Sequence, residues 1–160
     1  MSTKGFNKNK QMKLTIELVP STAWYSNVRS NVTQAEWDVI RRACYKKAGY
    51  KCEICGGKGP KHPVECHEIW NYDDENCTQT LEGMIALCPD CHQVKHIGLA
   101  GIKGKQAEAI EHLAKVNEIT LEEAALYVEH CFEEWSKRSE KEWKLDISIL
   151  ENKEDEKGND

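Results

Sequence analysis

One stretch of the sequence decides the fold, and it runs from Cys52 to His96: CEICGGKGPKHPVECHEIWNYDDENCTQTLEGMIALCPDCHQVKH. It contains two C-x2-C pairs with 32 residues between them. Each pair presents two thiolates on one side of a tight turn, and two such turns complete the tetrahedral ligand set of a structural zinc ion. Buried reduced thiols are the alternative, but they do not require this spacing twice. The predicted zinc ligands are Cys52, Cys55, Cys88 and Cys91.

Three histidines lie inside the same stretch. His92 and His96 are four residues apart on an expected helix, so their imidazoles project from one face and could bind one metal ion. His67 lies on an expected strand that the zinc site would tie to this helix. The pattern predicts a second divalent metal, Mg²⁺, Mn²⁺ or Zn²⁺, with an open position for water or phosphate and with Glu65 and Glu68 nearby. An ordinary, partly exposed histidine pair is the alternative.

Periodicity and capping residues indicate the surrounding secondary structure. Leu14, Ile16 and Leu18 alternate as in a half-buried strand, and Thr33 and Thr120 each begin a capping box. Pro89 fits the first turn of the helix that carries the two histidines. We expect strands over 13–19, 64–70 and 84–87, a polar loop over 72–78, and helices over 34–48, 89–98, 106–116 and 121–137.

These elements predict an α+β protein in which the 34–48 helix and a C-terminal helical hairpin flank the zinc-stapled centre. Gly98, Gly101 and Gly104 predict a flexible connector before that hairpin. The expected segments are a disordered N-terminus over 1–11, a zinc domain over 12–100, the helical hairpin packed on it over 101–150, and a disordered acidic tail over 151–160.

Composition excludes the membrane-spanning class. The mean hydropathy is -0.69, and no apolar run approaches the ~20 residues that a spanning helix needs. The first twelve residues lack the apolar region of a signal peptide, so we expect a cytoplasmic protein whose eight cysteines are metal ligands or buried thiols. We expect the five tryptophans to pack the core and the helices, with base stacking as the alternative: Trp24, Trp37, Trp70, Trp135 and Trp143.

The charge is unevenly distributed along the chain. The net charge is -5, yet residues 41–61 contain seven Lys and Arg against one acid, Glu53. Such a block contacts phosphates or forms a solvated helix face. A nucleic-acid partner therefore remains allowed, and a homodimer through the C-terminal helices is a further hypothesis. The expected nucleic-acid-binding residues are Arg41, Arg42, Lys46, Lys47, Lys51 and Lys95.

The order of these motifs resembles that of the HNH, or ββα-metal, endonucleases of the zinc-knuckle type. The matching parts are the first C-x2-C pair, the strand VECHEI over 64–69, and the segment LCPDCH over 87–92 with Lys95 and His96 after it. A looser likeness to bacterial and phage HNH endonuclease-like proteins extends from about Val19 to Leu150.

The resemblance implies a hairpin and helix that hold one divalent metal at a scissile phosphate. It implies an endonuclease that cleaves or nicks DNA phosphodiester bonds, with His67, His92 and His96 binding the catalytic metal. The catalytic residues would then be His67, Glu68 and His92. The alternative is a catalytically degenerate HNH-like zinc module that binds nucleic acid, a protein partner or a small ligand.

Two positions depart from the family pattern. In the family, a strand histidine activates the attacking water and a loop asparagine orients that histidine. If His67 is the metal ligand here, the base position next to it is Glu68; if His67 is the base, Cys66 takes the ligand position. The asparagine position corresponds to Gly83.

Overall fold

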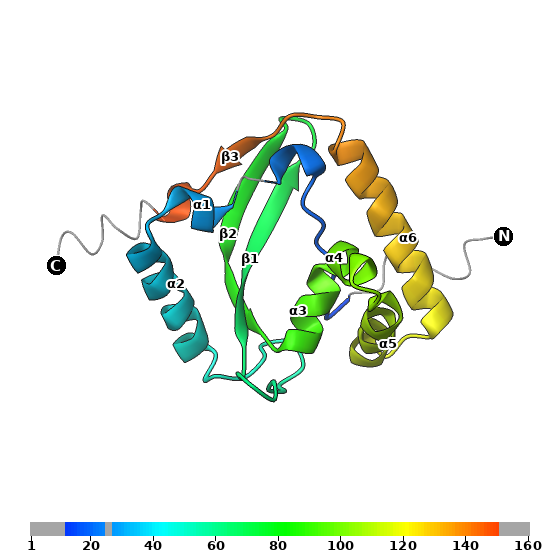
Figure 1. Ribbon diagram of the computed structural model, residues 1–160. Coiled ribbons are helices and arrows are strands. Elements are labelled where there is room, and N and C mark those ends of the chain that lie inside the picture. The colour runs from blue at the N-terminus through cyan, green and yellow to red at the C-terminus, as the bar shows by residue number, and fades with distance from the viewer. Residues whose placement is uncertain (1–11, 25–26, 151–160) are drawn as a thin grey trace.

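The computed structural model describes residues 12–24 and 27–150, so the disorder expected over 1–11 and 151–160 falls outside the described residues. The described chain is an α+β protein with a three-stranded sheet, and Figure 1 shows α2 on one side of the sheet and α3 to α6 on the other. The strands are β1 (Glu65–Asp73), β2 (Thr78–Leu87) and β3 (Lys144–Asp146). The helices are η2 (Ser21–Ala23), α1 (Val28–Asn31), α2 (Gln34–Lys47), α3 (Pro89–Lys95), α4 (Ile97–Ile102), α5 (Gln106–Asn117) and α6 (Leu121–Arg138).

A β-hairpin lies at the centre of the sheet. β1 pairs antiparallel with β2, with His67 opposite Ile85, and the two strands extend further than the sequence predicted, into the expected polar loop over 72–78. Pairing between the two strands satisfies the backbone N–H and C=O groups of these polar residues. Side-chain periodicity carries no information about this backbone pairing, so the sequence indicated a loop. β3 pairs parallel with β2 and was missed, because three residues are too few to show a strand period.

The expected strand over 13–19 is wrong. Leu14 and Ile16 are buried as the alternation predicted, but the segment joins no strand of the described sheet. Its backbone donates to side chains instead: the Leu14 N–H to Asn117 Oδ1 at 2.9 Å, and the Ile16 N–H to the Tyr127 hydroxyl at 3.0 Å. The segment therefore runs as an extended strap between the hairpin and the α5–α6 pair (Figure 1).

The expected flexible connector at Gly98–Gly104 is also wrong over most of its length. α4 begins at Ile97 and includes two of the three glycines. Ile97 and Ala100 are buried against α5, and this burial outweighs the roughly 1 kcal/mol that a glycine costs in a helix. Gly104, with φ +75°, marks the turn before α5.

The other expected helices form, but the helix expected over 89–98 ends at Lys95, and His96 separates it from α4. α2 and α6 begin with the capping boxes of Thr33 with Glu36 and of Thr120 with Glu123. α5 and α6 pack on each other, and α5 packs on α3. Buried side chains of both helices, such as Leu113, belong to the same core as the cysteines. No helix within the described ranges is long and apolar enough to cross a membrane.

Candidate metal centres

The first candidate centre is the predicted four-cysteine cluster. The sulfurs of Cys52, Cys55, Cys88 and Cys91 all lie within 4.8 Å of one another. Cys55 is exposed and the other three are buried. Across the two pairs, the Sγ atoms of Cys55 and Cys88 are 3.6 Å apart. The cluster could bind one zinc ion, and its four thiolates would leave no open position on it.

Backbone N–H groups surround these sulfurs. In each C-x2-C pair, the N–H of the second cysteine donates to the Sγ of the first at 3.4 Å. The Gly57 N–H donates to Cys55 Sγ at 3.3 Å, and Gly56 reverses the chain with φ +78°. These donors stabilise thiolate charge, which is the form that binds metal.

The first cysteine turn is clamped to the end of β2. The Glu53 N–H donates to the Ala86 carbonyl at 2.9 Å, and the Glu53 carboxylate accepts the Ala86 N–H at 2.8 Å. A Cβ on Gly59 would lie 2.7 Å from the Pro89 ring, so glycine is required for the loop to approach α3 this closely. The cluster therefore joins the end of β2 to the start of α3.

One neighbour of the cluster was missed. His112 Nε2, on α5, lies 3.2 Å from Cys91 Sγ. Hydrogen bonding by Cys91 lowers the pKa of Cys52 to about 4, whereas burial raises the pKa of Cys88 to about 11. The thiols therefore differ in how readily they ionise, and zinc binding would displace the protons that remain.

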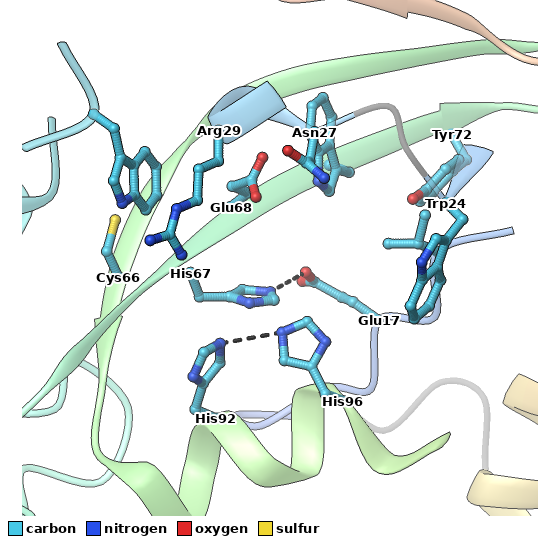
Figure 2. A pocket seen from close by; sticks show the side chains of 13 residues that line it. Glu17, Trp24, Asn27, Arg29, Cys66, His67, Glu68, Tyr72, His92 and His96 are labelled. Atoms are coloured by element: carbon cyan, nitrogen blue, oxygen red, sulfur yellow. Dashed lines mark hydrogen bonds and ion pairs between the residues drawn. The ribbon is translucent and has the colours of Figure 1, made fainter. Parts of the chain in front are cut away.

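The second candidate centre is the predicted histidine cluster. His67 on β1, His92 on α3 and His96 directly after α3 each offer a ring nitrogen, and these atoms lie within 4.8 Å of one another. The Nε2 atoms of His92 and His96 are 3.1 Å apart, and the three ring centroids are 4.7 to 5.3 Å apart. Figure 2 shows the rings pointing toward one another. They could hold one metal ion.

Carboxylates hold two of the three imidazoles. His92 Nδ1 lies 2.9 Å from Glu65 Oε1, and His67 Nε2 lies 2.7 Å from Glu17 Oε2. Glu65 and His67 share a face of β1 because they are two residues apart. Hydrogen bonding at Nδ1 leaves Nε2 of His92 for a metal, an arrangement common around metal-binding histidines.

Glu17 was missed by the sequence analysis, and it explains the position of Lys95. The Lys95 ammonium donates to Thr15 Oγ1 at 2.7 Å and to Glu17 Oε1 at 3.2 Å. Lys95 is only 4% exposed. It therefore presents no charged group to a nucleic acid, contrary to the expected role, and instead anchors the strap beside the histidines.

The imidazoles of His92 and His96 favour their neutral forms. Loss of water around the ring lowers the pKa of His92, and the same effect lowers the pKa of His96 together with the nearby charges of His92 and His67. A neutral imidazole has the free lone pair that a metal needs. His92 and His96 thus keep the lone pairs that could bind a metal near neutral pH.

Glu68 lines the same cavity as the three rings, but its carboxylate is bonded to the backbone of α1. Glu68 Oε2 accepts the Val28 N–H at 2.7 Å, at the start of α1, and burial raises the pKa of this carboxyl. Gly83 lies in β2 opposite Ile69 and borders the groove between α2 and the sheet. Glycine at this position has no side chain that could orient His67.

The histidines form one side of a cavity of about 380 Å³. Glu17 and Glu68 also line it, and so do aromatic and polar side chains from η2, α1, α2 and β1 (Figure 2). These additional lining residues are Trp24, Asn27, Arg29, Trp37, Trp70 and Tyr72. The cavity places a candidate metal beside a large apolar surface.

The predicted basic residues do not share one face. Arg41 pairs with Asp38 at 2.9 Å and borders a second hollow beside Glu65, whereas Lys47 borders the groove toward β2. The other three are exposed: Arg42, Lys46 and Lys51.

Comparisons of this chain with protein-family models, curated proteins and solved structures found no match.

Proposed function

We propose that this protein is a metal-dependent HNH-type endonuclease that cleaves or nicks DNA phosphodiester bonds. The observation that carries the proposal is the convergence of three histidines within 4.8 Å at the side of an open cavity. They come from a β-hairpin and from the region of the helix that follows it. The HNH endonucleases, which the sequence resembles, have their elements in the same order. His92 lies on α3, His96 directly follows that helix, and His67 lies on β1.

The histidines fit a divalent metal. His67, His92 and His96 would hold it, and the carboxylate of Glu65 fixes the ring of His92. A divalent metal bound there would neutralise the charge that develops on the phosphate and on the leaving oxygen. Three protein ligands leave coordination positions for water and substrate, in contrast to a closed structural site.

Glu68 is the proposed base for the attacking water. Its Oε2 is engaged by the Val28 N–H, which leaves Oε1 to accept a proton. Burial raises its pKa toward the range in which a carboxylate is an effective base. Burial also acts on Glu17, but hydrogen bonding to His67 and the charge of Lys95 outweigh it and lower the pKa of Glu17. Glu17 is therefore the weaker base.

The test is plasmid nicking with Mg²⁺, Mn²⁺ or Zn²⁺, together with the metal content of the purified chain. We expect His92→Ala to reduce nicking by about 10²–10³-fold. The variant would lose the metal that neutralises the negative charge developing in the transition state. It should lose one metal per chain while the four-cysteine zinc stays bound. His130→Ala, on α6, is the matched control and should change neither quantity. A wild-type protein that nicks DNA with none of these metals would overturn the proposal.

One observation favours the second candidate, a degenerate module that binds nucleic acid without cleavage. The family base and asparagine are replaced by Glu68 and Gly83, and the Glu68 carboxylate already caps the start of α1. Retained DNA binding without cleavage would identify this function. Glu68→Gln separates the two candidates further, since it should lower nicking in an enzyme and leave binding unchanged in a module.

A further inference from the structure

One end of the histidine cavity carries an exposed tryptophan. Trp24 is 65% exposed, whereas Trp37 is 8% exposed and packs in the core as the sequence predicted. Trp24 nevertheless borders the histidine cavity, and Tyr72 lies near it (Figure 2). A large apolar ring left in water beside a cavity contributes little to folding. It is the arrangement by which proteins offer a face for a stacked nucleobase.

A cation lies on the other side of the same cavity. Figure 2 shows Arg29 and Trp24 on opposite sides of the histidine rings. Arg29 is exposed, and its guanidinium carbon lies 5.8 Å from the centroid of the Trp37 ring, which holds the side chain over the cavity. Guanidinium groups bind phosphate in bidentate fashion. The cavity thus offers an aromatic face, a metal site and a phosphate-binding cation in that order.

The size of the cavity limits what can fill it. A volume of about 380 Å³ lies at the low end of the range of about 300–1,000 Å³ for small-molecule sites. In a duplex the bases are stacked inside the helix, so a side wall such as Trp24 cannot reach a base face unless the nucleotide is turned out of the stack. Only an unpaired nucleotide could place its base on Trp24 and its phosphate near His92.

We propose that this cavity binds one unpaired nucleotide of a DNA strand, with its base stacked on Trp24 and its phosphate between Arg29 and the histidines. The inference rests on the proposed endonuclease function and specifies its substrate as single-stranded or locally unpaired DNA. The natural consequence is a preference for single strands over fully paired duplex.

The binding test uses the full chain carrying His92→Ala, so that no cleavage interferes. The probe is a fluorescein-labelled 12-residue oligothymidylate, compared with a hairpin duplex of the same length. We expect tighter binding of the single strand and a loss of about 5- to 150-fold in affinity with Trp24→Ala. Trp24→Phe keeps a stacking face and should retain most of the affinity. Ile102→Ala, an exposed site on α4, is the control and should change nothing.

Arg29 is tested by the salt dependence of the same binding. Arg29→Ala should lower the slope of log K against log salt by about one, because one phosphate contact is lost. Arg29→Lys should restore the slope. Lys103→Ala, also exposed and basic, is the matched control and should leave the slope unchanged.

The outcomes separate this inference from the proposed function. Equal affinity for single strand and duplex, with no effect of a correctly melting Trp24→Ala variant, would overturn the inference even if wild type cleaves DNA. Binding of the single strand through Trp24, with no cleavage by wild type, would leave the inference standing and overturn the endonuclease. If both hold, Trp24→Ala should raise KM for single strands far more than it lowers kcat.

Discussion

In both the four-cysteine and the three-histidine cluster the ligand atoms lie within 4.8 Å of one another, yet the surroundings of the two clusters differ. Three of the four cysteines are buried and backbone N–H groups surround the sulfurs. The histidines instead border an open cavity, and two carboxylates hold their rings. The contrast teaches that exposure and ligand number, more than proximity, distinguish a site that maintains the fold from one that can meet a substrate.

The two clusters are also mechanically connected. The cysteine cluster joins β2 to the start of α3, and α3 carries His92 and leads directly to His96. The third histidine reaches them from β1, whose register with β2 is set by the hairpin. Loss of the first cluster should therefore disturb the second, whereas loss of the second should leave the first intact.

The largest expected effect tests this asymmetry through Cys88→Ser. Metal-binding free energy is folding free energy in small zinc domains, so the variant should lose zinc and the cooperative melting of the central region. Metal analysis and thermal unfolding measure both. Cys77→Ser, in the hairpin turn, is the control and should keep both. A Cys88→Ser protein with full zinc content and an unchanged melting temperature would refute the structural assignment.

The second effect concerns the ion pair behind the histidines. Glu17→Ala leaves the ammonium of Lys95 buried without its carboxylate, which typically costs about 3–5 kcal/mol. Urea unfolding should show a loss near the lower end of this range, since Glu17 keeps some contact with water. Combining Glu17→Gln with Lys95→Met removes the unpaired charge and should recover much of the stability. An unchanged midpoint for Glu17→Ala would mean that the pair is not formed.

A smaller effect separates ligand orientation from catalysis. Glu65→Gln should weaken metal binding at the histidines by about 10–100-fold, because the ring of His92 loses its charged partner. Titration with Mn²⁺ or Co²⁺ measures this affinity, and the four-cysteine zinc should be unaffected. Glu68→Gln is the matched carboxylate control and should leave the affinity unchanged. Equal losses in both variants would contradict the distinct roles given to the two residues.

The smallest effect is the pH dependence of the histidine site. The pKa values of His92 and His96 are lowered from the ordinary value near 6.5, so at these two ligands protons compete with metal only below that pH. Metal affinity should change little between pH 7.5 and 6.5 and fall as the pH decreases further. A steep loss already above pH 6.5 would show that the imidazoles are protonated more readily than their surroundings indicate.

The sequence by itself indicated the cysteine pairs and the His92–His96 pair, because the spacing within each pair is local, and the order of motifs added His67. Two i, i+3 cysteine pairs and an i, i+4 histidine pair define turns and a helix face over a few residues. The capping boxes likewise placed the starts of α2 and α6, since each involves residues three positions apart.

Only the tertiary structure decided what surrounds the ligands. Glu17 is 50 residues from His67 along the chain, and its segment shows the alternation of a strand although it is a strap. His112 and Trp24 carry no local pattern that relates them to either cluster. Periodicity reports which side of an element is buried, but the partner on that side is chosen by packing between distant segments. The chemistry of the cavity follows from that packing.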